Sequence, residues 1–161
     1  MTDELTGLNN RAYFVNCVTR TIQNDANGKY SFMILDIDKF KDVNDTYGHP
    51  VGDKCLRMVS KCMKEDFNSD FICCRLGGDE FAILCLNPHS KEELTDNIQR
   101  FKNDIILRSD ECDGIKLTLS VGVINYVKGD DFETMYKLAD SALYDAKNNG
   151  RNCISYYGKR D

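Results

Sequence analysis

The chain has 161 residues, of which 42% are hydrophobic and 29% are charged, and its formal net charge is −5. This length predicts a single domain that can bury its own core. The negative charge argues against broad electrostatic binding to nucleic acid or to anionic membranes, because both need an excess of cationic surface. No apolar run approaches the roughly 18 residues of a membrane span, and the acidic start MTDELTGLNN differs from a signal peptide. We therefore expect a cytoplasmic segment without membrane contact.

Eight cysteines are spread along the chain, and none of them belongs to a C-x-x-C pair. Several lie inside apolar runs, which favours reduced thiols in the core over zinc ligands or disulfides. Cys55 and Cys62 are seven residues apart in a segment with helical periodicity, so they fit the buried stripe of one helix.

Four elements are predicted in the first part of the chain. Residues 9–25 carry apolar side chains at helical spacing, with an Asn available as N-cap. YSFMILDI, residues 30–37, is a continuous apolar run ending in acid, which is typical of a strand buried on both faces. A short helix over KFKDVNDTYG and a longer helix after Pro50 follow.

A tight hairpin is predicted around RLGGDEF, residues 75–81. Apolar strands at about 71–76 and 81–86 flank it, with only glycines and acids between them. Two successive glycines tolerate the positive φ angles that such a turn demands.

The last part of the chain predicts two helices and two strands. Residues 94–105 and 132–146 carry apolar side chains at helical spacing, and Gly150 ends the second helix. Residues 115–123 alternate apolar with smaller or polar side chains, which predicts a half-buried strand. NCISYY can return as an edge strand.

This order of elements predicts an α/β (α+β) fold. A central, mostly antiparallel sheet of about five strands is expected, flanked by helices and not doubly wound, because the hairpin in the middle rules out simple βαβ repetition. No linker or repeat interrupts the chain, so residues 1–161 are expected to form one domain.

Acidic residues mark the ends of these predicted elements. Asp36 closes the first strand, Asp38 follows two residues later, and Asp79 and Glu80 lie in the hairpin. If the first strand pairs beside the hairpin, Asp36 and the hairpin acids converge. Carboxylates held so close need a compensating cation. Oxygen ligands of this kind suit Mg²⁺ or Mn²⁺, ions that are commonly shared with phosphate oxygens.

A simpler interpretation applies to some of these acids. Asp38, Asp42 and Asp45, taken singly, are better explained as solvated turn residues or helix caps. The hairpin differs, because its glycines let a ligand approach the backbone closely. Lysines and an arginine follow the acids, although a Lys in a last helical turn also has a favourable interaction with the helix dipole.

Five blocks of the sequence, in this order and spacing, resemble the GGDEF family, the diguanylate cyclases, over essentially the whole chain: DELTGLNNR, DIDKFKDVND, YGHPVGD, RLGGDEF and AKNNGRN. The resemblance implies a palm-like, ferredoxin-like fold. It also implies a nucleotidyltransferase that joins two GTP molecules into cyclic di-GMP and releases two pyrophosphates. Each domain of such an enzyme holds one GTP, so a homodimer is expected to be the working form.

The resemblance also implies roles for individual residues. Asp36 and Asp79 would bind metal through their side chains and Ile37 through its carbonyl, while Glu80 would be a ligand or a catalytic carboxylate. Two Mg²⁺ or Mn²⁺ ions per site are expected. Lys41 would join the three acids as a catalytic residue.

Substrate binding is expected from residues in the same blocks. The amides around Lys39 and Phe40 and the side chain of Lys41 would hold phosphates. Guanine presents adjacent N–H donors that a carboxylate can accept, which supports a guanine-reading pair and favours GTP over ATP. The remaining implied substrate-binding residues are Asn44 and Asp53 for the base, Lys147 and Arg151 for phosphates, and Gly77 and Gly78 beside the nucleotide.

One stretch departs from the family. Many members carry an inhibitory product site, R-x-x-D, where this chain has NSDF, residues 68–71. Asn68 cannot supply the guanidinium fork and Phe71 cannot supply the acid, so we expect no product inhibition there. The chain begins at the catalytic block, so it is expected to be a weakly active fragment of a longer protein. An upstream sensory or dimerising region could also anchor that protein in a membrane.

Two alternatives to an active cyclase stay open at this point. One is a catalytically weak or inactive GTP-binding signalling module, in which acids or glycines are usually damaged, whereas here they are intact. The other is a scaffold, which leaves the five blocks unexplained. His49, which precedes a proline and a helix, is expected to be structural or capping and not a catalytic base.

Overall fold

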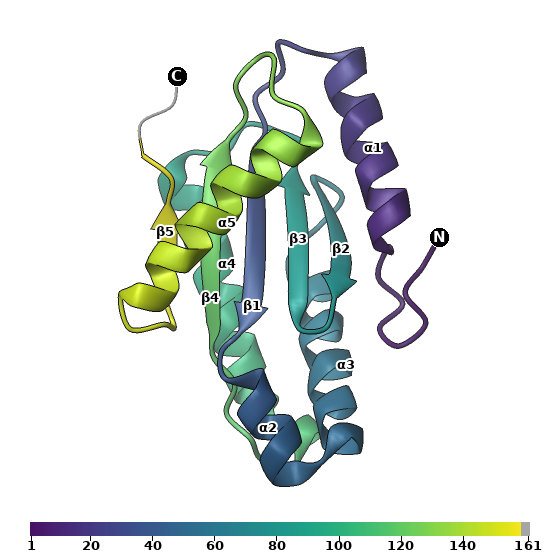
Figure 1. The fold of residues 1–161 in the computed structure, drawn as a ribbon, viewed down its shortest axis with the longest axis vertical. Helices are drawn as coiled ribbons and strands as arrows, with labels where there is room; N and C mark the ends of the chain where they lie inside the picture. Colours follow the sequence, from purple (N-terminus) through teal and green to yellow (C-terminus); the bar gives the residue numbers. More distant parts are fainter. Residues whose placement is uncertain (159–161) are drawn as a thin grey trace.

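A computed structural model describes residues 1–158 and has one five-stranded sheet with helices on both faces (Figure 1). The strand order is β2-β3-β1-β4-β5. The strands are β1 (Ser31–Ile37), β2 (Phe71–Gly77), β3 (Glu80–Cys85), β4 (Leu119–Asn125) and β5 (Ile154–Tyr156). The helices are α1 (Arg11–Asn24), α2 (Phe40–Tyr47), α3 (His49–Asp66), α4 (Lys91–Leu107) and α5 (Phe132–Asn148), with a short 3-10 turn at Ser109–Cys112. The predicted α+β architecture with a mostly antiparallel sheet is confirmed.

The central strand is β1, because its apolar run can be covered on both faces. It pairs antiparallel with β3 on one side and with β4 on the other, and β2 and β3 form the predicted hairpin. The edge strand β5 pairs with β4 and is parallel to it. The C-terminal end of β1 and the tip of the hairpin consequently lie at the same end of the sheet (Figure 1).

The two faces of the sheet have separate cores. Met33 and Leu35 of β1 pack in a cluster with residues of α3 and α4, including the buried Cys55 and Cys62. Phe32 of β1 and its neighbours on the same side pack with residues of α1 and α5. Because side chains alternate along a strand, every second residue of β1 and β3 faces α5. Figure 1 shows α5 crossing that face, with α3 and α4 behind the sheet.

The strand predicted at 115–123 differs from β4 in position and burial. It begins at Leu119, and all of its residues up to Ile124 are buried, so it is not half-buried. The small residues on its second face accommodate α5. A Cβ atom added to Gly122 would lie 2.2 Å from the carbonyl oxygen of Ala139 and 2.3 Å from the amide nitrogen of Leu143. The alternation in the sequence therefore reflects large and small residues in a strand that is covered on both faces.

The other predicted elements are confirmed, with shifts of one to a few residues at their ends. Within residues 1–158, no helix has both the length and the apolar character that crossing a membrane would require.

Candidate active site

The acids predicted to bind metal meet at the end of the sheet where β1 finishes. Asp36, the next-to-last residue of β1, is paired with Glu80, the first residue of β3. The amide of Ile37 donates to the carbonyl oxygen of Asp79 at 3.4 Å. The antiparallel pairing of β1 with β3 therefore brings Asp36 and Ile37 together with Asp79 and Glu80, although the two pairs are more than 40 positions apart in the chain.

A cation from α5 reaches this acidic cluster. Lys147, in the last turn of α5, forms an ion pair and a hydrogen bond with the carboxylate of Asp36. The side chain of Asp36 is only 14% exposed, so water screens this interaction less than it would at the surface. Burial lowers the pKa of Lys147, but the hydrogen bond and the negative charge of Asp36 outweigh that effect and raise it.

The hairpin acids resist ionisation. Burial raises the pKa of Asp79, and the negative charge of Asp36 raises it further. Burial also raises the pKa of Glu80; a hydrogen bond from Tyr136 opposes this, and the charge of Asp36 adds to it. Both shifts have the same main cause, which is burial, and the nearby charge of Asp36 adds to it.

Tyr136 of α5 holds one of these carboxylates in place. Its hydroxyl donates to Oε1 of Glu80 at 2.9 Å, and the guanidinium of Arg11 lies 5.5 Å from the centre of its ring. Burial and the bond to Glu80 raise the pKa of Tyr136 to about 12. Sequence reasoning missed this contact, because the helical periodicity assigns Tyr136 to an apolar stripe.

The tip of the hairpin is braced by the N-terminal block of the sequence. Nε of Arg75 donates to the carbonyl oxygen of Gly78 at 2.9 Å, and Nη1 of Arg75 lies 3.2 Å from Oδ1 of Asp3. Gly78 has φ +51°, a left-handed conformation that favours glycine. A Cβ atom added to Gly77 or Gly78 would meet no other atom within 4 Å, so the space beside the tip is open.

The residues predicted to bind phosphates lie on two separate segments. Lys39 has the left-handed φ of +53° and precedes α2, whose first turn has no side-chain cap. Phe40 begins α2, and the exposed Lys41 follows it. Arg151 is exposed in the turn after α5. An uncapped helix start presents backbone N–H groups to which an anion can bind.

The predicted guanine-reading residues are neighbours across the α2–α3 junction. Oδ1 of Asn44 lies 1.9 Å from the position that a Cβ on Gly52 would occupy. Only a glycine there leaves room for the Asn44 carboxamide against the start of α3. Asp53 follows directly, and both polar side chains remain partly exposed.

The prediction for Asp38 is wrong, and of the two roles expected for His49, structural or capping, the capping role is contradicted. Asp38 is neither a helix cap nor a solvated turn residue, because its carboxylate accepts hydrogen bonds from Thr118, Ser120 and the amide of Asn152. His49 does not cap α3, since the N-cap is Gly48 and no side chain makes a capping bond there. The local sequence could not reveal the partners of Asp38, which lie 80 or more positions away.

The chemistry of the acidic cluster fits a hard divalent cation. The available donors are carboxylate and carbonyl oxygens, which Mg²⁺ and Mn²⁺ prefer. Within residues 1–158, no group of three or more His, Cys, Asp or Glu side chains already has the arrangement of a metal site. Lys147 and Tyr136 instead occupy oxygens of Asp36 and Glu80.

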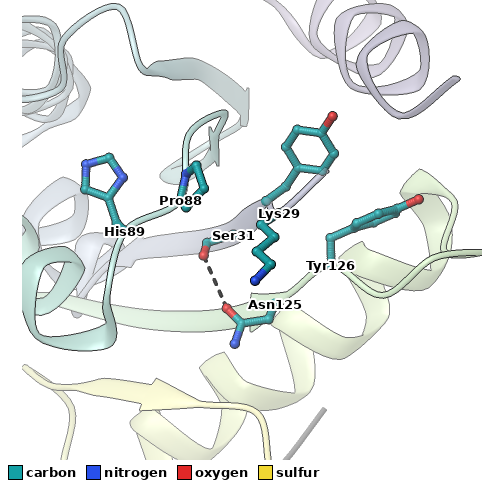
Figure 2. Close-up of a pocket in the computed structure, with 7 residues that line it drawn as sticks. Lys29, Ser31, Pro88, His89, Asn125 and Tyr126 are labelled. Atoms are coloured by element: carbon teal, nitrogen blue, oxygen red, sulfur yellow. Dashed lines mark hydrogen bonds between the residues drawn. The ribbon is translucent and has the colours of Figure 1, made fainter. Parts of the chain in front are cut away.

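A surface hollow at the other end of the sheet is a different feature (Figure 2). Lys29, His89, Asn125 and Tyr126 are among the residues that line it, and the hydroxyl of Ser31 donates to Asn125 across it. Ser31 begins β1, whereas the acids lie near the end of that strand. Among residues 1–158, no carboxylate lines this hollow, so it is separate from the acidic site.

Comparison with known proteins agrees with this geometry. Residues 1–153 match the family model described as diguanylate cyclase, GGDEF domain. The chain belongs to the GGDEF family. Relatives of this GGDEF domain include the probable diguanylate cyclase DgcT of Escherichia coli K12, which is 36% identical over 159 residues. The match covers 94% of this chain and 34% of DgcT. The diguanylate cyclase VdcA of Vibrio cholerae is 34% identical, with 94% of this chain and 45% of VdcA covered.

Solved GGDEF domains have the same fold. The GGDEF domain of DgcB from Caulobacter crescentus, solved in complex with c-di-GMP, superposes with a TM-score of 0.88 at 28% identity, covering 98% of this chain and 96% of that one. The diguanylate cyclase SiaD of Pseudomonas aeruginosa, solved with its activator SiaC, gives 0.87 at 30% identity, covering 96% and 61%. This GGDEF chain spans about a third of the length of the first curated relatives that it matches.

The repulsion within the acidic cluster predicts a gain in stability when one acid is neutralised. Asp79→Asn should raise the free energy of unfolding of the metal-free GGDEF domain by about 0.5–2 kcal/mol near neutral pH. The folded protein binds the Asp79 proton more tightly than the unfolded chain does, because burial and Asp36 raise its pKa. Wild-type stability should therefore fall as the pH rises through that raised pKa, and less so in the variant.

Urea titrations in the presence of a chelator, at mildly acidic and at neutral pH, measure this difference. Asp96→Asn, an equal charge change at an exposed position of α4, is the matched control and should leave stability almost unchanged. Lower stability of Asp79→Asn than of wild type at neutral pH would show that the cluster is not under repulsion.

Proposed function

We propose that this domain is a diguanylate cyclase, which condenses two GTP molecules into cyclic di-GMP and releases two pyrophosphates. The observation that carries the proposal is the meeting of Asp36, Asp79 and Glu80 at the end of β1, in a chain of the GGDEF family. Such a cluster suits phosphoryl transfer, where cations must compensate the charge of both the protein and the substrate.

Divalent ions belong to this proposal. The carboxylates of Asp36, Asp79 and Glu80, with the carbonyl of Ile37, would hold two Mg²⁺ or Mn²⁺ ions per site. Bound there, the ions would lower the pKa of the attacking hydroxyl and neutralise charge on the phosphoryl oxygens. The raised pKa values of Asp79 and Glu80 support this assignment, because an added cation would stabilise their ionised forms.

Phosphate binding falls to the two cationic segments. The amides of Lys39 and Phe40 and the ammonium of Lys41 would hold the phosphate chain from one side. Lys147 and Arg151 would approach it from the end of α5. The left-handed backbone at Lys39 and the start of α2 support this role, since no side chain caps the N–H groups of the first turn.

Base recognition falls to Asn44 and Asp53. A carboxylate at Asp53 can accept from the two adjacent N–H donors of guanine, which adenine lacks. The Asn44 carboxamide packs closely on Gly52, the residue before Asp53, which supports a shared role for the two side chains. A site built for these donors would discriminate strongly against ATP.

The reaction needs two copies of the domain. The 3′-hydroxyl oxygen of one GTP attacks the α-phosphorus of the other, a new P–O bond forms, and the bond to pyrophosphate breaks. The same step in the opposite sense closes the ring. Because each domain holds one GTP, a homodimer must face its two sites toward each other.

The proposed enzyme is not inhibited by its product through the R-x-x-D site that many family members have. The side chain of Asn68 accepts a hydrogen bond from the amide of Asp70, and the ring of Phe71 packs against Phe67 and His89. These positions support the turn and the core, and neither offers the charge that an R-x-x-D site supplies.

Incubation with GTP and Mg²⁺ over a range of protein concentrations tests the activity. Cyclic di-GMP should form, with a rate that rises more steeply than linearly because two domains must meet. Asp79→Ala and Glu80→Ala should each remain folded and lose at least about 100-fold in rate. Asp96→Asn, at an exposed position, should retain the wild-type rate.

Retained turnover in both alanine variants would contradict the proposed mechanism. GTP binding without any turnover, at every protein concentration, would instead indicate an inactive signalling module.

Addition of cyclic di-GMP tests the proposed lack of feedback. Its affinity should be the same, within about twofold, for wild type and Asn68→Ala, because Asn68 lacks the guanidinium that would bind the product. Calorimetry measures this affinity. Tight binding that the Asn68→Ala substitution abolishes would show that the site exists after all.

A further inference from the structure

The turn that carries Arg151 has an unusual backbone. Three successive residues have positive φ: Gly150 at 102°, Arg151 at 65° and Asn152 at 49°. For a residue with a Cβ atom, the left-handed region costs roughly 1–2 kcal/mol. Such a conformation persists only where the surrounding structure fixes it.

Both ends of this turn are tied to neighbouring elements. The amide of Arg151 donates to the carbonyl oxygen of Ala146 in α5 at 3.1 Å, and the thiol of Cys153 donates to the same oxygen at 3.2 Å. The amide of Val121 in β4 donates to the carbonyl oxygen of Cys153 at 3.0 Å. These bonds fix where the turn begins and ends, but not its middle.

The middle of the turn is held by Asp38. The amide of Asn152 donates to Oδ2 of Asp38 at 3.0 Å, a contact across 114 positions of the chain. The carboxylate of Asp38 is fixed in turn by the hydroxyls of Thr118 and Ser120, each at 2.6 Å. The amide of Asp38 also donates to the carbonyl oxygen of Thr118 at 2.9 Å. Asp38 is therefore attached to β4 through both its backbone and its side chain.

A buried lysine of α4 interacts electrostatically with this carboxylate. Lys102 of α4 is 7% exposed. Burial lowers the pKa of Lys102, and the negative charge of Asp38 opposes that shift. The positive charge of Lys102 therefore offsets part of the negative charge beneath the turn.

Asp38 also adjoins the second phosphate-binding segment, because the next residue is Lys39 with its left-handed φ of +53°. One carboxylate thus connects the start of α2 with the turn after α5. We infer that Asp38 is a positioning residue, which holds the Arg151 turn beside the start of α2 so that both segments can bind one phosphate chain. The inference rests on the proposed function, in which these segments bind the phosphates of GTP.

A purely structural staple makes a different prediction. If Asp38 only stabilised the fold, removing its side chain would lower stability, and any change in phosphate affinity would be the same with or without the Arg151 side chain. If Asp38 acts through Arg151, the effects of removing the two side chains on triphosphate affinity should not add, since the second removal has nothing left to disturb.

Calorimetry with Mg²⁺ and an α,β-methylene analogue of GTP, which the enzyme cannot turn over, provides the test. Asp38→Ala and Arg151→Ala should each weaken binding by about tenfold, the size expected for one charge-assisted hydrogen bond. The double variant should bind no more weakly than Arg151→Ala alone. Asp42→Asn, an equal charge change at an exposed position of α2, should bind as wild type does.

Two further measurements keep the test decisive. If Asp38→Ala does not fold, Asp38→Asn, which keeps the shape of the side chain, replaces it. Asp38→Asn should weaken binding of the GTP analogue when Arg151 is present and should have no further effect in the Arg151→Ala variant. Amide hydrogen exchange at Asn152 should accelerate in the Asp38 variants, because the bond that protects it is lost or weakened.

Independent, additive losses would overturn the inference, as would unchanged affinity in the Asp38 variants while Arg151→Ala binds weakly. Failure of the wild-type protein to bind the analogue would overturn the proposed function, and the inference with it.

Discussion

The antiparallel pairing of β1 with β3 places Asp36 opposite Glu80. Other groups at this end of the molecule compensate the negative charge of these carboxylates. Lys147 neutralises Asp36, and Tyr136 donates to Glu80. Arg75 donates a hydrogen bond to the carbonyl oxygen of Gly78 at the tip of the hairpin. Lys147 and Tyr136 come from α5, and Arg75 comes from the hairpin and also pairs with Asp3, so the contacts at this end of the sheet fix the mutual positions of α5, the hairpin and the N-terminal block.

The negative charge of the hairpin acids is only partly compensated, and this bears on function. Burial, and to a smaller extent the negative charge of Asp36, raises the pKa values of Asp79 and Glu80, so their ionised forms are costly in the folded protein. Proteins commonly accept lower stability at a site that must bind charge, because the ligand supplies what the fold lacks. In the proposed cyclase, divalent ions bring that missing charge together with the substrate.

The sequence predicted most of the fold because its patterns are local. The apolar run of β1, the glycines of the hairpin and the stripes of the helices each reflect contacts within one element. The strand β4 was misplaced because alternation of large and small residues resembles alternation of buried and exposed ones; only the closeness of α5 to Gly122 distinguishes them.

The candidate site was less accessible to such patterns. Local spacing places acids at the ends of strands, but the role of each residue came from the resemblance to a family. Asp38 and Tyr136 were missed because their partners are 56 to 114 positions away. A tyrosine in an apolar stripe does not reveal that its hydroxyl faces a carboxylate, and a lone aspartate after a strand does not reveal three donors.

The central claim is that Asp36, Asp79 and Glu80 together bind a divalent cation. Titration of Mn²⁺ into the metal-free protein, followed by electron paramagnetic resonance of the free ion, measures this most directly. Wild type should bind Mn²⁺, and Asp36→Asn should bind it at least about tenfold more weakly, while the distant Asp96→Asn should match wild type. Equal affinity in wild type and Asp36→Asn would contradict the account.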